Sequence, residues 1–529
     1  MPLVQSGHYK NTSPIGQLRR YKTLPVAALA CALFGATQEP GLHGEAEPTR
    51  PRPIQHVVVI VQENVSFDHY FAMYPRAANP PGEPAFRARR GTPSVNGLSP
   101  GLIASNPNST KPFRLDRSRQ LVCNPSPFYP GEQRAYHSGL LDRFPESTGQ
   151  TANTDPPCEF GLGTGVVMGY YDGNTVTALW NYAQNFAISD NFYGTTYGQS
   201  VPGHVNIISG QTHGAIVVKA AADLDVSVVE ETLFGDAGAA LEDCGNHNGT
   251  EVILTGTNVG DLLNAKGLTW GWFGAGFTPT SRNPDGTAVC GASHINISGV
   301  NARDYYAGQP FQKYSSTANP HHLPPSSVSM IGYSDQANHQ YDLSNFWVAA
   351  NAGHLPAVSF LRAPSYQAGH PQSSDPLDEQ AFLVDTVNRI QSLPQWENTV
   401  IFITWDDSGG WYDHVMPPIV NPSNTRVDAL TGEASCGTAA PGAYQGRCGY
   451  GPRIPLIAIS PWARVNFVDH SVTDQSSILR FIEDNWDLGR IGDQSFDERA
   501  GSLMNIFDFR RPGASKLILD RMTGEPVQQ

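Results

Sequence analysis

Two pairs of oxygen-bearing side chains, Glu63-Asn64 and Asp406-Asp407, each follow an apolar run in this sequence of 529 residues. The runs, IQHVVVIVQ and VIFITW, are rich in β-branched and aromatic residues, which is typical of buried strands in a parallel sheet. Because the carboxyl ends of parallel strands meet at one edge of a sheet, we expect the four side chains to lie close together there.

These four side chains predict a site for one divalent metal ion, because adjacent carboxylates repel each other unless they share a positive charge. A single Asp-Asp pair is more often a solvated loop or a helix cap, but two pairs at strand ends favour a metal site. The candidate ligands are Glu63, Asn64, Asp406 and Asp407. Their oxygens suit Mg²⁺, Ca²⁺ or Mn²⁺, and neighbouring histidines would also allow Zn²⁺ or iron.

Ser200 lies in a glycine- and proline-rich segment, YGQSVPGH, which predicts a turn. A bound metal can lower the pKa of a hydroxyl and offset the negative charge of a phosphate, so a serine near the cation could act as a nucleophile. A serine in a turn is common, however, and its spacing alone does not single it out. The assignment of Ser200 therefore needs evidence beyond its position in the sequence.

Histidines in loops bounded by glycine or proline are a third group of candidates: His321, His322, His370 and His414. A histidine of ordinary pKa can bind phosphate oxygens as a cation or protonate a leaving alkoxide near neutral pH. Further histidines are weaker candidates for the same roles: His69, His137, His204, His339 and His470.

Strand and helix patterns alternate along the chain and imply an α/β fold with a mostly parallel sheet flanked by helices and long loop insertions. The segments TVTALWNYAQNF, DEQAFLVDTVNRIQ and DQSSILRFIEDNW have the apolar spacing of helices, and RIPLIAIS reads as a third buried strand. We expect residues 80–160 to form a surface excursion. Residues 215–350 could belong to the main sheet or form a partly separate insertion.

The chain is expected to have three parts: an export signal and linker over 1–50, a single domain with those two insertions over 51–515, and a C-terminal tail over 516–529. In the first part, two arginines precede the apolar run LPVAALACALFGA, which is the layout of an export signal. This run is shorter than the roughly 20 residues that a membrane-spanning helix needs. The sequence therefore predicts a periplasmic or secreted protein without a transmembrane segment in the mature chain.

The route of export is expected to be the twin-arginine route, because Arg19 and Arg20 stand side by side before the apolar run. An ordinary basic leader is the alternative. Attachment as a lipoprotein at Cys31 is disfavoured, because Ala28 stands where such signals usually have leucine.

Composition excludes one class of partner and indicates disulfides. The net charge of −14 disfavours a general nucleic-acid binder, because phosphate backbones would be repelled. Removal of the export signal would remove Cys31 and leave an even number of cysteines, which is typical of exported proteins with disulfides. Of the connectivities open to them, pairing of sequence neighbours is the simplest: Cys123–Cys158, Cys244–Cys290 and Cys436–Cys448.

Several long segments together resemble the phosphoesterase family that contains bacterial phospholipases C, the non-specific phospholipases C of plants and certain acid phosphatases. ENVSFDHYF is similar to the family's ENRSFDHYFG motif, and TWDDSGGWYDHVMPP is similar to its second metal motif. The segment from MGYYDGN to SGQTHG is similar to the family's nucleophile region, and GYGPRIPLIAISPWA with HSVTDQSSILRFIEDNW to its closing strand and helix.

The resemblance implies a fold similar to that of alkaline phosphatases and sulfatases, and it implies roles for single residues. Glu63, Asn64, Asp406 and Asp407 would bind the metal, and Ser200 would be the phosphorylated nucleophile that also faces the metal. His321, His322 and His370 would bind phosphate or act as general acid, and His414 would support the acidic ligands.

The activity implied by the resemblance is phospholipase C hydrolysis. Phosphatidylcholine-like phospholipids would be cleaved to diacylglycerol and a phosphorylated head group, with transient contact to a membrane surface. An acid phosphatase acting on small soluble phosphate monoesters would use the same residues, and an exported binding protein without turnover is a third hypothesis. The chain departs from the family in GQSVPGH, where many members have GPT or GPS, and in CNPSPFY, where many have a histidine. The head-group preference therefore stays open.

Overall fold

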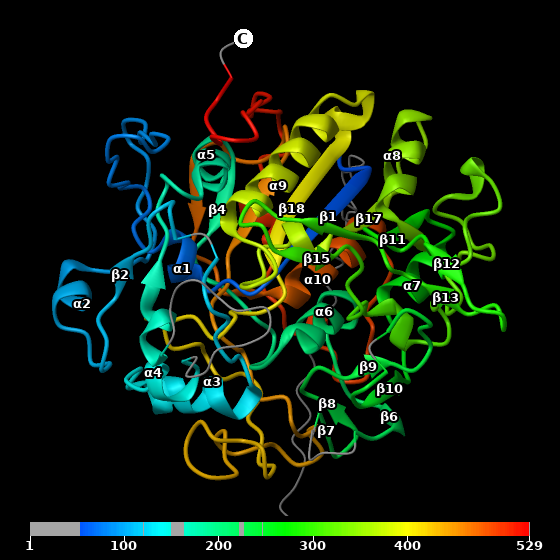
Figure 1. The fold of residues 1–529 in the computed structure, drawn as a ribbon, viewed down its shortest axis with the longest axis horizontal. Helices are drawn as coiled ribbons and strands as arrows, with labels where there is room; N and C mark the ends of the chain where they lie inside the picture. The colour runs from blue at the N-terminus through cyan, green and yellow to red at the C-terminus, as the bar shows by residue number, and fades with distance from the viewer. Residues whose placement is uncertain (1–52, 120, 150–162, 222–226, 246, 528–529) are drawn as a thin grey trace, which may run out of the picture. The chain divides into compact units, whose positions relative to one another are not determined.

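A computed structural model of the chain describes residues 53–119, 121–149, 163–221, 227–245 and 247–527. Contacts group residues 52–529 into one compact unit. Its centre is an eight-stranded sheet with the strand order β16-β11-β17-β1-β18-β19-β4-β20. Figure 1 labels β11, β17, β1, β18 and β4 of this sheet. In that order, the strands are Gln340–Asp342, Trp270–Gly274, Val358–Arg362, His56–Gln62, Thr399–Trp405, Leu456–Ile459, Ala187–Ser189 and Phe467–Asp469.

The strand directions confirm the predicted α/β class with a mostly parallel sheet. β1 runs parallel to both of its neighbours, β17 and β18. The predicted third strand is present as β19, but it runs antiparallel to β18 and to β4. Apolar periodicity predicts that a strand is buried and gives no information about its direction, so the structure corrects the expectation of a parallel strand here.

Helices cover both faces of this sheet, because successive side chains of β1 point alternately into two apolar cores. Val58 and Ile60 belong to one apolar core with residues of α5, α8 and α9, whereas Val57 and Val59 belong to another with residues of α6, α7 and α10. These helices are Thr177–Asn185, Leu343–Asn351 and Pro376–Gln391 on the first face, and Ser200–Ser209, Val259–Lys266 and Gln475–Trp486 on the second. The three helices predicted from apolar spacing correspond to α5, α9 and α10.

Ser200 begins helix α6, so the segment predicted as a turn is in fact a helix start. Pro202 is tolerated there because the first turn of a helix does not need its backbone N–H groups for intrahelical bonds. The helix ends at Gly210, which takes the left-handed conformation (φ 61°) common after helices. Gly198, Pro202 and Gly203, which suggested a turn, therefore mark the start of a short helix.

The two expected insertions differ in how they join the domain. The first contains the short helices α2 (Pro100–Ala104), α3 (Tyr129–Tyr136) and α4 (Phe144–Ser147). The second contributes β11 and β16 to the main sheet and also forms a three-stranded sheet of β6 (Ala215–Lys219), β10 (Glu251–Leu254) and β9 (Gly238–Ala239). Residues 215–350 thus contribute strands both to the main sheet and to a smaller sheet.

The segment expected as a C-terminal tail packs along α9. The Gln391 side chain donates to the carbonyl of Leu517 (2.7 Å), and Asn388 donates to the carbonyl of Leu519 (2.8 Å). The predicted export signal lies outside the described residues. Among the residues that are described, we find no helix with the length and apolar character needed to cross a bilayer.

Candidate active site

The two strand-end pairs lie next to each other because β1 and β18 are adjacent and in register, with Gln62 opposite Trp405. The backbone N–H of Asn64 donates to Asp406 Oδ1 (3.0 Å). Asn64 has a left-handed backbone (φ 59°), a conformation that asparagine tolerates better than most residues. The four candidate ligands are buried. The strand-end argument from the sequence thus predicted their proximity correctly.

Ser200 is brought to the same edge by the start of α6. Its Oγ lies near three acceptor oxygens: Glu63 Oε2 at 3.2 Å, Asn64 Oδ1 at 3.2 Å and Asp407 Oδ2 at 3.0 Å. A hydroxyl has one proton and can donate to only one of them at a time. The cluster therefore has more acceptor oxygens than protons to share among them. A hard cation prefers ligand oxygens of this kind.

Burial and mutual repulsion raise the pKa of the acidic groups in this cluster. The pKa values of Asp406 and Asp407 lie well above the usual range, first because of burial and then because of neighbouring carboxylates. The pKa of Glu63 is also raised by burial, although Arg362 opposes the shift. Asp406 Oδ2 is buried without a hydrogen-bond partner. A divalent cation held by these oxygens would relieve both the repulsion and the missing contact, so the residues present fit such an ion.

Arg362 is a site residue that we did not predict. It ends strand β17 and contacts Glu63 Oε1, and its guanidinium lies over the Tyr306 ring, 4.4 Å from the centroid. Its side chain is about as buried as that of Glu63. The signal that identified the acidic pairs, a polar residue directly after a buried strand, was also present in VSFLR.

His204 was a weaker candidate and proves to lie in the cluster. It stands one turn after Ser200 in α6, and its Nδ1 lies 2.8 Å from the Ser200 carbonyl and 3.5 Å from Asp406 Oδ2. Glu63, His204 and Asp406 can together offer ligand atoms to a metal ion. Burial lowers the pKa of His204 to about 3, and the charge of Arg362 acts in the same direction. His204 is therefore neutral, as a metal ligand must be, and cannot bind phosphate as a cation.

His370 lies beside the cluster, as expected. It lines a cavity of about 350 Å³ together with Glu63, Tyr306 and Arg362. Its Nδ1 is 2.7 Å from the carbonyl of Pro371. Burial lowers the pKa of His370, and the nearby carboxylate of Asp406 opposes this shift.

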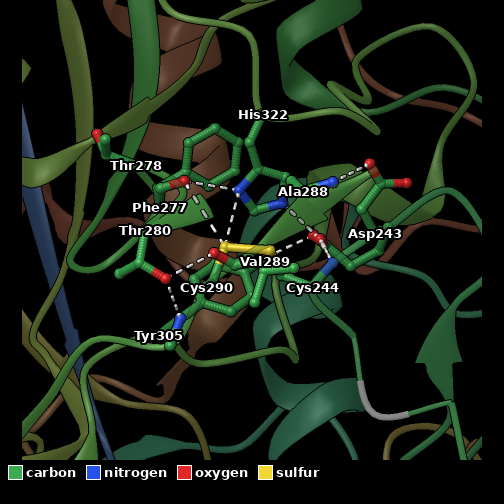
Figure 2. Close-up of a disulfide and its surroundings, with 12 residues drawn as sticks. Asp243, Cys244, Phe277, Thr278, Thr280, Ala288, Val289, Cys290, Tyr305 and His322 are labelled. Carbon is green, nitrogen blue, oxygen red and sulfur yellow. Dashed lines mark hydrogen bonds and ion pairs between the residues drawn. A yellow bond between two sulfur atoms is a disulfide. The ribbon is translucent and has the colours of Figure 1, made fainter. Parts of the chain in front are cut away.

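His321 and His322 are not brought to Ser200, which corrects their predicted placement. Figure 2 shows His322 stacked on Phe277 beside the Cys244–Cys290 disulfide. Its side chain is fully buried, with Nδ1 2.7 Å from the Phe277 carbonyl and Nε2 2.5 Å from Glu242 Oε1. His321 is exposed and pairs with Asp243. The sequence showed two histidines in a loop, but it could not show that their ring nitrogens contact the Phe277 carbonyl, Glu242 and Asp243.

His414 does not contact the acidic ligands that it was expected to support. Its Nδ1 lies 2.6 Å from Asp68 Oδ2, and Arg453 binds both Asp68 and Asp413, each at 3.1 Å. The guanidinium thus fills the space that a cation could share with these carboxylates. The other weaker candidates also have partners elsewhere: His69 with Gly169, His137 with Asp142, His339 with Trp270, and His470 with Asp190.

A further buried carboxylate, that of Glu132 in α3, comes from the first insertion. It accepts hydrogen bonds from the Ser408 hydroxyl and from the backbone N–H of Gly198 (2.8 Å). Burial raises the pKa of Glu132 to about 7. Glu132 thereby connects the segment before Ser200 to the segment after Asp407, a link between distant parts of the chain that the sequence did not indicate.

Two of the three predicted disulfides are present, Cys244–Cys290 and Cys436–Cys448. The third predicted pair involves Cys158, which lies outside the described residues. Cys31 also lies outside them.

The fold and the cluster define a class of protein: an α/β domain whose sheet edge presents a serine hydroxyl among buried carboxylates. The model of the Phosphoesterase family matches residues 54–489, so the chain belongs to that family. The match contains Glu63, Asn64, Ser200 and both aspartates of the second pair. The family predicted from the sequence motifs is therefore confirmed.

Relatives from bacteria and plants are named phospholipases C. The chain is 24% identical over 474 residues to "Non-hemolytic phospholipase C" of Pseudomonas aeruginosa, covering 87% of this chain and 58% of that protein. For the protein of the same name in Burkholderia pseudomallei, the identity is 26% over 496 residues, with 88% and 60% covered. "Non-specific phospholipase C6" of Arabidopsis thaliana is 24% identical, with 78% and 62% covered. The chain thus spans about three fifths of the length of these relatives.

One solved structure, described as a protein in the alkaline phosphatase superfamily from Vibrio parahaemolyticus, is 10% identical and matches with a TM-score of 0.27. The match covers 59% of this chain and 60% of that one.

Proposed function

We propose that the chain is a metal-dependent phosphoric ester hydrolase of the phospholipase C type, with Ser200 as nucleophile. The observation that carries the proposal is the position of Ser200 Oγ, within 3.0 to 3.2 Å of oxygens from Glu63, Asn64 and Asp407. A divalent cation held by these oxygens and Asp406 would supply Lewis-acid charge that lowers the pKa of the hydroxyl and offsets the charge of the phosphate.

Solvent and a histidine account for the proton transfers. In the proposed reaction Ser200 Oγ attacks phosphorus and its proton passes to water, because the three oxygens near the hydroxyl would hold the cation. The bond between phosphorus and the leaving oxygen breaks, and a histidine protonates the alkoxide, for which His370 is the best-placed candidate. Water then hydrolyses the phosphoserine. Because burial lowers the pKa of His370, we expect this role to favour acidic pH.

The proposed substrates are phosphatidylcholine-like phospholipids, which would yield diacylglycerol and a phosphorylated head group. The names of the bacterial and plant relatives support this choice. The alternative is an acid phosphatase acting on soluble monoesters, which the acidic preference expected for His370 would favour. The proposed location of the enzyme is the periplasm or the medium.

Ser200→Ala tests the proposed nucleophile. We expect turnover of phosphatidylcholine to fall by about a thousandfold or more, because the variant cannot form the phosphoserine. Ser209→Ala, which removes a buried hydroxyl at the other end of α6, is the matched control. Wild-type turnover by Ser200→Ala would contradict the proposed nucleophile.

Assays with two substrates separate the alternatives. Phosphatidylcholine and a chromogenic phosphate monoester are offered to the wild-type protein with each candidate cation after treatment with a chelator. Turnover of the lipid alone supports the phospholipase, and turnover of the monoester alone supports the phosphatase. Turnover of neither with any cation would support an exported binding protein without catalysis.

A further inference from the structure

A β-hairpin at the mouth of the His370 cavity exposes two isoleucines. It consists of β14 (Ser293–Ile295) and β15 (Asn301–Arg303), and β15 is labelled near the centre of Figure 1. Ile295 is 70% exposed and Ile297 is 46% exposed. Among the large hydrophobic side chains that the structure describes, Ile295 is the most exposed. Asn296 between them is buried, so the two isoleucines share the outer face of the chain.

This exposure does not belong to a loosely held loop, because hydrogen bonds anchor the turn of the hairpin to the start of α9. The backbone N–H of Ile297 donates to the carboxylate of Asp378 (3.2 Å), and the Ser298 hydroxyl donates to Asp375 (3.1 Å). The Asn296 side chain donates to the carbonyl of Ser373 (3.1 Å). The isoleucines are therefore held outward by a preorganised turn, and a partner binding there has little backbone entropy to overcome.

The hairpin is continuous with the candidate active site. Residues 300–303, which contain the whole of β15, line the same cavity of about 350 Å³ as Glu63, Arg362 and His370. A surface that contacts Ile295 and Ile297 would thus lie beside a cavity that reaches Glu63, whose Oε2 is 3.2 Å from Ser200 Oγ. Apolar side chains exposed singly are common on proteins, but two on one anchored turn at a cavity mouth need an explanation.

We infer that this hairpin is a contact surface for phospholipid bilayers, with Ile295 and Ile297 entering the boundary between head groups and acyl chains. The inference rests on the proposed function. Arg303 of β15 is exposed and lines the cavity; one guanidinium nitrogen donates to the Cys290 carbonyl (3.0 Å), and the rest of the group can pair with lipid phosphate. The net charge of −14 gives the protein no general attraction to anionic surfaces, so binding has to come from local apolar insertion.

Vesicle binding by Ser200→Ala protein tests the surface without turnover. Ser200→Ala is compared with the same protein carrying Ile295→Ser and Ile297→Ser, by co-sedimentation with phosphatidylcholine vesicles. We expect the two serines to lower the partition coefficient by about tenfold or more, because they remove the apolar side chains that enter the bilayer. Thermal unfolding of each variant verifies that the fold is intact.

The matched control replaces Ile216 and Val218 by serine in strand β6. These side chains are similarly exposed, at 53% and 56%, and belong to the separate three-stranded sheet. The control should bind vesicles as the parent does. Equal loss in both double variants, unchanged binding by the hairpin variant, or a parent that does not bind vesicles would each overturn the surface.

The outcomes for the surface and for the proposed function are separable. Hairpin-dependent binding by a wild-type protein that hydrolyses neither ester would overturn the hydrolase and leave the surface standing. Hydrolysis of phosphatidylcholine with binding that does not depend on the hairpin would do the reverse. If the hairpin variant instead abolishes self-association in sedimentation experiments without lipid, the face is an interface between copies of the chain, and the lipid surface is wrong.

Discussion

At the scale of single residues, charge balance governs the candidate site. Glu63, Asp406 and Asp407 are all buried, and burial of a carboxylate is costly unless a positive group compensates it. Arg362 supplies one such group through its contact with Glu63. Asp406 Oδ2 has no hydrogen bond, and the pKa values of both aspartates are raised, which indicates that one guanidinium is not enough. This imbalance is a physical reason, independent of motifs, to expect a cation.

Arg362→Met tests this balance. Removing one partner of a buried ion pair leaves an uncompensated charge, so we expect the free energy of unfolding to fall by about 3 kcal/mol when a chelator is present. The loss should shrink when a divalent cation is added, because the cation restores a positive neighbour to Glu63. Urea unfolding with chelator and with cation measures both values. Arg134→Met, which changes an exposed arginine of α3, is the control, and an equal effect there would contradict the prediction.

Glu379 in the first turn of α9 predicts a pH dependence of stability. It accepts hydrogen bonds from the Tyr70 hydroxyl (2.8 Å) and from Trp405 Nε1 (2.9 Å), and burial raises its pKa from 4.5 to about 8. The folded protein therefore retains a proton that the unfolded chain loses near pH 4.5. The stability contributed by this proton is complete below pH 4.5 and declines as pH rises, until the folded carboxyl ionises near pH 8.

Glu379→Gln removes this titration. Relative to wild type, we expect the free energy of unfolding of the variant to rise by at most about 1.4 kcal/mol per pH unit between pH 4.5 and about 8, with no further rise above pH 8. Urea unfolding at several pH values provides the measurement. Glu397→Gln, which alters an exposed glutamate, is the matched control. A Glu379→Gln difference that is constant with pH would contradict the assignment.

At the scale of elements, the site depends on how closely α6 approaches the end of β18. Gly203 lies in the first turns of α6, and a Cβ atom added there would be 1.9 Å from the backbone oxygen of Asp406. Only glycine allows this approach. The sequence GQSVPGH thus contains a packing requirement that places Ser200 against the acidic pair, and it is not merely a marker of a turn.

Gly203→Ala distinguishes packing from helix propensity. Propensity alone predicts that alanine stabilises a helix by about 1 kcal/mol, whereas the clash predicts a loss of about 2 kcal/mol. We expect the loss, and we expect turnover to fall by about a hundredfold because Ser200 is displaced from the carboxylates. Gly513→Ala, where an added Cβ meets no atom within 4 Å, is the control. A stabilised and fully active Gly203→Ala variant would refute the packing argument.

At the scale of the whole molecule, a cation that binds only the folded protein should stabilise all of it. At a free cation concentration of 100 times its Kd, the expected gain in unfolding free energy is about 2.7 kcal/mol. Asp407→Asn should weaken cation binding by about tenfold or more and so remove about half of the gain. Asp487→Asn, which changes an exposed aspartate at the end of α10, should retain the full gain. Thermal unfolding at several cation concentrations measures the gain. An unfolding temperature of the wild-type protein that does not change with cation concentration would exclude the cation site.

The sequence by itself determined the strand-end pairs and the family. Buried strands are revealed by local apolar runs, and the rule that ligands lie beyond the carboxyl ends of strands needs no knowledge of the fold in detail. Glu63-Asn64 and Asp406-Asp407 could therefore be placed together in advance. Two disulfides and the three helices with clear apolar spacing followed from equally local signals.

Only the tertiary structure decided which other side chains reach this edge. In the folded protein, Arg362 and His204 lie beside the carboxylates, and His322 contacts Glu242 instead. Strand β19 runs antiparallel to β18. Each of these outcomes depends on the register and packing of segments far apart in the chain, and local periodicity does not contain that information. Ser200 stands between the two cases, since its motif was visible in the sequence, while its distance to the acidic oxygens is set by the contact of α6 with β18.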